Sequence, residues 1–127
     1  MSFQIRWGNR WVYKKFSGAV TADEFALSLK KTQSDPRFND LAYAINDFSD
    51  VEAALVSGDD VRRFVALGLG AVLSNPELQT VVLTRNPELA ALVTHFAKGS
   101  LIAVHVFASV AEVQAWMPEP YRDQIPW

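Results

Sequence analysis

Residues 80–107, TVVLTRNPELAALVTHFAKGSLIAVHVF, decide the fold that we expect for this chain. A short apolar run stands at each end of this stretch, and between them lies a helix signal that opens on Asn86-Pro87 and stops at Gly99. Asparagine is a good helix cap, proline is favoured at the first helical position, and glycine commonly follows the last turn. Because a helix that joins two short apolar strands is typical of parallel pairing, the stretch predicts a strand, a helix and a second, parallel strand.

Three further helix starts combine a hydroxyl residue with an acidic residue three positions later, which is the capping-box pattern. The pairs are Thr21 with Glu24, Ser57 with Asp60, and Ser109 with Glu112. The first two of these helices are expected to end at Asp35-Pro36 and Asn75-Pro76, because the residue before a proline is disfavoured in a helix. The last helix is short and runs through Trp116.

The N-terminal segment predicts a β-hairpin over residues 3–16. Phe3, Ile5 and Trp7 alternate with polar residues, which is typical of a half-buried strand. A Gly-Asn turn follows, and the second strand is rich in aromatic and β-branched residues. Its lysines suggest a solvated face.

The resulting element order is β-β-α-β-α-β-α-β-α, an α/β domain with a mostly parallel sheet, the hairpin at one edge and helices covering the sheet. The remaining strands are expected at residues 41–47, 80–84 and 101–107. Residues 1–117 form this domain, and residues 118–127 form a C-terminal tail that packs back through Tyr121 or Trp127.

Composition narrows the function classes. The chain has 127 residues, a net charge of −2 and no cysteine, so disulfides, thiolate chemistry and cysteine-based zinc sites are excluded. It carries no basic field that would favour nucleic acid. The longest apolar run, residues 64–73, is too short to span a membrane and is interrupted by two glycines. We therefore expect a soluble, cytoplasmic domain without nucleic-acid partners.

In open α/β sheets, sites lie beyond the carboxyl ends of the strands, which directs attention to residues 47–60. This segment is expected to be an interaction loop followed by a helix start. Its candidate residues are Asp47, Phe48, Asp50, Gly58, Asp59 and Asp60. Carboxylates here, with Glu52, could hold a hard cation, but aspartate and serine in loops commonly bond their own backbone, so no metal site and no cofactor are predicted.

Two motifs in this segment, DFSDV at residues 47–51 and VSGDDV at residues 56–61, resemble the strand end and helix start of STAS domains. These are the SpoIIAA-like anti-sigma-factor antagonists and their relatives, and the likeness covers residues 1–117 in topology. The resemblance implies a SpoIIAA-like fold and a regulatory module that binds a protein partner. It further implies phosphorylation at the helix start, which by position is Ser57, although Val56 stands where the signalling members have aspartate.

The serines have a simpler interpretation as well. Ser57 is a good helix cap, and Asp59 and Asp60 in the first turn would repel a phosphate group. Ser49 is the other candidate phosphorylation site, or a turn residue. No motif makes His95 or His105 a base, and no nucleotide-binding loop or nucleophile elbow occurs, so we expect a non-enzymatic protein.

The second helix raises a different function. It is apolar nearly all round, so it is either packed tightly on the sheet or presents one face to a protein partner, a second copy of the chain or a small apolar ligand. A lipid-like ligand accords with a looser resemblance to Sec14-type lipid-binding domains. The candidate contact residues on this helix are Phe64, Leu67, Gly68, Gly70 and Ala71, of which the glycines suggest a close backbone approach.

Overall fold

The computed structural model describes residues 3–98, 101 and 103–127, except for the side chains of Ala54, Leu55 and Phe96. Its strands are β1 (Phe3–Gly8), β2 (Trp11–Thr21), β3 (Tyr43–Leu55), β4 (Gln79–Leu83) and β5 (Ala103–Phe107). Its helices are α1 (Ala22–Gln33), the 3-10 helix η1 (Pro36–Asp40), α2 (Gly58–Ser74), α3 (Pro87–Ala97), α4 (Val110–Trp116) and α5 (Glu119–Arg122). The expected helix stop at Gly99 lies outside the described residues.

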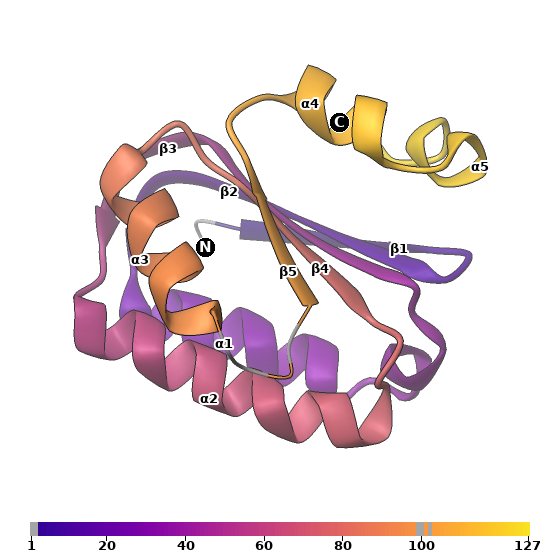
Figure 1. Cartoon of the computed structure of the whole chain (residues 1–127), viewed down its shortest axis with the longest axis horizontal. Coiled ribbons are helices and arrows are strands. Elements are labelled where there is room, and N and C mark those ends of the chain that lie inside the picture. Colours follow the sequence, from indigo (N-terminus) through magenta and orange to yellow (C-terminus); the bar gives the residue numbers. More distant parts are fainter. Residues whose placement is uncertain (1–2, 99–100, 102) are drawn as a thin grey trace.

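The strands form one mixed sheet of five strands in the order β1-β2-β3-β4-β5. The first pair is antiparallel, with Phe3 opposite Phe16, and the other neighbours are parallel. Helices α1, α2 and α3 cover one face of this sheet, while α4 and α5 lie against the other (Figure 1). The general α/β class that the sequence predicts is confirmed.

The expected helix caps form as the sequence predicts. Thr21 accepts a hydrogen bond from the Glu24 amide, and Ser109 accepts one from the Glu112 amide. Asn86 caps α3 through the amides of its first turn, and Ser57 and Asp60 form a complete capping box at the start of α2. These local signals place all four expected helices within a residue of their expected starts, because a side-chain acceptor satisfies amides that the helix itself leaves free.

The interaction loop expected at residues 47–60 is wrong for most of its length, because β3 continues to Leu55. Beyond Asp47 this strand pairs with the end of β2, where the register shifts after Lys15 and again after Gly18. Gly18 has a φ of 70°, a conformation that favours glycine. Cross-strand backbone hydrogen bonds along this extension outweigh the turn preference of the Asp and Ser residues.

The C-terminal tail packs back onto the sheet, as expected, but it also contains the unexpected short helix α5. Tyr121 and Trp127 pack against a buried cluster that includes Tyr13 and Val113. The Trp11 indole donates a hydrogen bond to the Gln124 side chain, 3.1 Å away. The tail therefore closes the sheet face that α4 only partly covers.

Candidate functional site

A cavity of about 140 Å³ lies between the sheet and the layer formed by α1, α2 and α3. Its floor is built by side chains of the central strands, its roof by α2, and its sides by α1 and α3. The lining is almost entirely apolar. Representative side chains are Ala44 and Val82 from the sheet, Phe25 from α1, Phe64 and Val65 from α2, and Val93 from α3.

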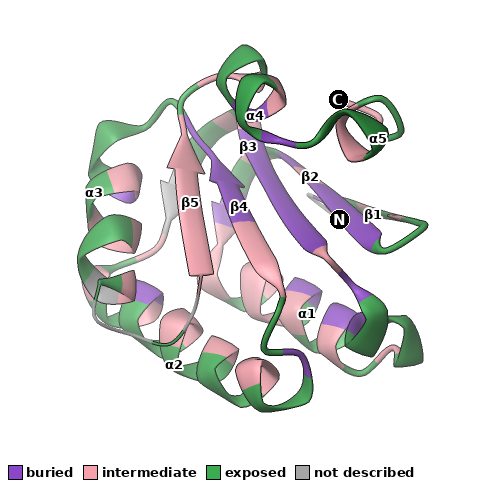
Figure 2. Cartoon of the chain, turned by 45° about the vertical axis from the view of Figure 1, so that its right-hand side comes forward, coloured by how far each residue is buried: buried purple, intermediate pink, exposed green. Residues whose placement is uncertain are grey.

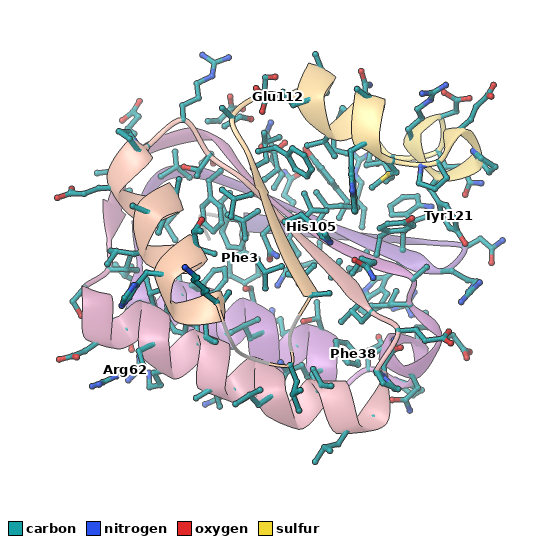
Figure 3. All side chains as sticks on the ribbon, viewed as in Figure 1. Phe3, Phe38, Arg62, His105, Glu112 and Tyr121 are labelled. Atoms are coloured by element: carbon teal, nitrogen blue, oxygen red, sulfur yellow. The ribbon has the colours of Figure 1, made fainter. Side chains whose placement is uncertain are left out.

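Helix α2 forms the roof because its sequence has an apolar stripe at helical spacing. Val61, Phe64, Val65 and Gly68 recur at intervals of three and four residues, and all of them line the cavity. The opposite side of the helix carries Arg62, which points away from the sheet in Figure 3. In the same view, Phe3 of β1 lies between the sheet and the helices.

The structure separates the predicted contact residues of α2 into two groups. Phe64, Gly68 and Ala71 line the cavity, while Leu67 and Gly70 face outward. A Cβ added at Gly70 would meet nothing within 4 Å, so no described part of this chain approaches Gly70 closely, and a close approach in a dimer stays a prediction. Helix α2 also packs on the sheet beside the cavity, since Val61 shares a buried cluster with Val82, and Ala71 packs against the cluster that contains Ala44.

Burial of the sheet side chains decreases towards the edge strand β5 on both faces of the sheet. On the face towards α4, Ile45 is completely buried, while Phe107 of β5 is half-buried. On the face towards α2, Val12 is completely buried, while Val104 of β5 is half-buried. Figure 2 shows β5 as half-buried along its length.

Lys14 lies on the floor of this cavity and is 2% exposed. Its ammonium nitrogen is 3.5 Å from the Ser28 hydroxyl and 5.5 Å from the centre of the Phe25 ring. Within the described residues, no carboxylate lies at ion-pair distance from it. Burial lowers the pKa of Lys14 to about 7. Lys14 is thus a buried amine whose charge the fold leaves without a counter-ion.

Asn46 is the cross-strand neighbour of Lys14 and also lines the cavity. Its amide nitrogen donates to the Val81 carbonyl at 3.2 Å, while its side-chain oxygen is buried without a hydrogen-bond partner. A buried acceptor without a partner is uncommon in folded proteins and generally has a structural or functional explanation. The cavity therefore holds one underused donor and one free acceptor on neighbouring strands.

Neither polar residue was predicted as part of a site. The sequence interpretation placed the lysines of the second strand on a solvated face, which is wrong for Lys14. Alternation offered a signal, because Val12 and Phe16 flank Lys14 at intervals of two and are both completely buried. A lysine in register with two core residues points towards the core.

No family model matches this sequence, and no curated protein or solved structure is significantly similar to it.

The predicted acidic segment is distributed over several separate environments. Asp47 is completely buried and accepts hydrogen bonds from the hydroxyls of Tyr13 and Ser49 and from the Lys15 ammonium group. Phe48 is buried and stacks on Phe16 with 4.6 Å between ring centres. Neither side chain is exposed for the partner contact that the sequence predicted, because both belong to the interior.

The remaining members of the segment lie at the surface. Asp50 forms an ion pair with Lys15 at 3.3 Å. Around the start of α2, where Gly58 is the first helical residue, Asp59 pairs with Arg62 and Asp60 with Arg63. In the described part of the chain, no three histidine, cysteine, aspartate or glutamate side chains converge as a metal site requires.

Both candidate phosphorylation sites have hydroxyl groups that already form hydrogen bonds. The Ser57 hydroxyl is exposed and accepts from the Asp60 amide at 3.1 Å. The Ser49 hydroxyl lies 2.6 Å from an oxygen of Asp47 and 3.2 Å from the Lys15 nitrogen. Hydrogen bonds from the Ser57 backbone amide and hydroxyl lower the pKa of Asp60, which keeps a negative charge beside Ser57.

His105 lies on the edge strand β5, outside the cavity. Its Nε2 atom is 2.7 Å from the Gln79 side-chain oxygen, and its ring lies 4.5 Å from that of Trp116. Burial lowers the pKa of His105.

Across the residues described here, no helix is long and apolar enough to cross a membrane.

Proposed function

We propose that this protein is a carrier or sensor that binds a small apolar ligand in the cavity beneath α2. The observation that carries the proposal is the apolar cavity of about 140 Å³ between α2 and the sheet. Small-molecule sites are typically concave and apolar, with a few polar groups that orient the ligand. The cavity beneath α2 has this combination, since Lys14 and Asn46 are set among aliphatic and aromatic side chains.

The energetics of the cavity support binding. Side chains that line an apolar cavity lack partner atoms on the side that faces it. A ligand that fills it regains those contacts. A dry apolar cavity of about 150 Å³ accommodates a molecule the size of benzene, so the ligand class comprises compounds of roughly six to eight carbon atoms.

This proposal follows the ligand-binding alternative that the sequence left open, in line with the looser resemblance to Sec14-type lipid-binding domains. The proposal also includes the SpoIIAA-like, mostly parallel sheet that the STAS resemblance implies. It further includes a cytoplasmic location for the protein. None of these features enters the test below, which depends on the cavity alone.

Two glycine variants on one helix provide the test. Gly68 faces the cavity and Gly70 faces solvent, so Gly68→Leu fills the cavity whereas Gly70→Leu adds the same side chain outside it. We expect wild type and Gly70→Leu to bind 1-hexanol equally in calorimetric titrations, and Gly68→Leu to bind at least tenfold more weakly. Equal binding by both variants, or no binding of hexanol by wild type, would reject the proposal.

The outer face of α2 favours a second candidate, the protein-interaction module that the STAS resemblance implies. Leu67, Leu69 and Leu73 are 45%, 39% and 87% exposed. Leu69 and Leu73 lie one turn apart on the same side of the helix, while Leu67 lies on the other flank of the cavity-facing stripe. A partner or a second copy of this chain would cover them. Sedimentation velocity of wild type and of the double variant Leu69→Glu/Leu73→Glu tests whether the chain forms a homodimer. If it does, wild type should show a concentration-dependent dimer that the double variant loses.

A further inference from the structure

Lys14 and Asn46 occupy one polar spot on the apolar floor of the cavity. They are paired across β2 and β3, so their Cα atoms are separated by one inter-strand spacing and their side chains leave the same face of the sheet. Lys14 supplies up to three hydrogen atoms for hydrogen bonds, and only the long contact to Ser28 uses one. Asn46 supplies a buried oxygen that accepts none.

A ligand group that binds beside Lys14 must accept a hydrogen bond from its ammonium group. It must also balance a single positive charge, because Lys14 of β2 is the only charged residue among the described side chains that line the cavity. A phosphate dianion would bring two charges against one cation. A carboxyl group brings one charge and two oxygens.

We propose that Lys14 binds the carboxyl group of a small aliphatic or aromatic acid whose apolar part fills the cavity. This inference rests on the proposed ligand-binding function and adds the chemical class of the ligand. The carboxylate accepts a hydrogen bond from the Lys14 ammonium group. The ligand thus supplies the counter-ion that the fold omits.

The proton balance of binding follows from the buried amine. Burial lowers the pKa of free Lys14 to about 7, so the amine is largely neutral above that pH. The bound pair is a carboxylate and an ammonium ion, so an acid anion that binds above pH 7 must be accompanied by uptake of one proton onto Nζ. An alcohol of the same length needs no such proton.

The test compares hexanoate with 1-hexanol, which share an apolar chain and differ in the head group. We measure both dissociation constants for wild type, Lys14→Met and Lys30→Met by calorimetry at pH 7. Lys30 is an exposed residue of α1, so its variant removes the same charge away from the cavity. We expect wild type and Lys30→Met to prefer hexanoate at least tenfold, and Lys14→Met to lose that preference while retaining hexanol.

Wild-type protein alone provides a second measurement that needs no folded Lys14 variant. Between pH 7 and pH 9, hexanoate binding should weaken by up to tenfold per pH unit, while hexanol binding stays constant. A preference for hexanoate that survives Lys14→Met, or hexanoate affinity that does not change with pH, overturns the carboxylate assignment. If hexanol binds while hexanoate does not, the cavity function stands and the acid is wrong; if neither binds, the cavity function itself is wrong.

Discussion

The Tyr13 hydroxyl donates a hydrogen bond to a carboxylate oxygen of Asp47 across β2 and β3, on the sheet face opposite the cavity. Burial and the neighbouring Asp47 raise the pKa of Tyr13 well above its ordinary value. Lys15 completes the arrangement with an ion pair to Asp47 at 3.2 Å. Consecutive lysines of one strand therefore have opposite environments: Lys15 has two carboxylate partners, and Lys14 has none among the described residues.

The Asp47 cluster should be a strong contributor to stability. Asp47→Asn removes a buried negative charge that Lys15 and two hydroxyl groups contact, and we expect it to lower the free energy of unfolding by about 3 kcal/mol. Tyr13→Phe removes one hydrogen bond and should cost about 1 to 2 kcal/mol. Urea denaturation at pH 7 measures both. Asp50→Asn, at a largely exposed partner of Lys15, is the control and should change stability little.

Acid should weaken the same cluster. Burial alone would raise the pKa of Asp47, but hydrogen bonds from Ser49, Tyr13 and Lys15 outweigh it and hold the pKa below its ordinary value of 3.8. The stabilisation is therefore fully present above pH 3.8 and is lost as the pH falls through the lowered pKa. The stability difference between wild type and Asp47→Asn should shrink below pH 4. A difference that stays constant from pH 6 to pH 2.5 would contradict this account.

Lys14 should reduce the stability of the ligand-free protein. Its pKa falls from 10.5 to about 7 on folding, so the unfolded chain binds the additional proton between these values and stability rises with pH across that range. Lys14→Met should stabilise the protein by about 2 to 4 kcal/mol at pH 7, since methionine has a similar shape without the buried charge. The gain should decline towards pH 10 in paired urea titrations. A gain that is the same at both pH values would show that Lys14 is not shifted.

The cap of α2 separates structural from regulatory roles of Ser57. Ser57→Ala removes the acceptor for the Asp60 amide and should cost about 1 kcal/mol. Ser57→Asp preserves a capping oxygen, so thermal unfolding should remain near that of wild type. If Ser57 is a phosphorylation switch, as the STAS resemblance implies, Ser57→Asp should also weaken binding of a protein partner; unchanged binding would leave the cap as its role.

Two glycines should respond in opposite directions to alanine. A Cβ at Gly8 would lie 2.0 Å from the Trp11 ring, so Gly8→Ala must displace a buried indole and should destabilise the protein by more than about 2 kcal/mol. Gly70 is exposed in the interior of α2 and has open space around it. Gly70→Ala should stabilise the protein by up to about 1 kcal/mol through helix propensity. Melting temperatures of the two variants provide the comparison.

The sequence by itself determined the features that depend on near neighbours in the chain. The helix starts were predictable because a capping side chain binds amides only two or three residues away. The caps are Thr21, Ser57, Asn86 and Ser109. The alternation of apolar and polar residues in β1 predicted which side chains face inward, and Phe3 does belong to the core. The α/β class followed from the order of these local signals.

Only the tertiary structure decided the length of β3, the burial of Asp47 and the existence of the cavity. The extension of β3 depends on pairing with the end of β2, about thirty residues earlier in the chain, and a strand partner at that distance has no signature in local composition. The cavity depends on the separation between α2 and the sheet. Lys14 and Asn46 became candidate site residues for the same reason. A buried polar side chain is destabilising when nothing pairs with it and can bind a ligand when it faces a cavity, and residues distant in the sequence decide which case applies.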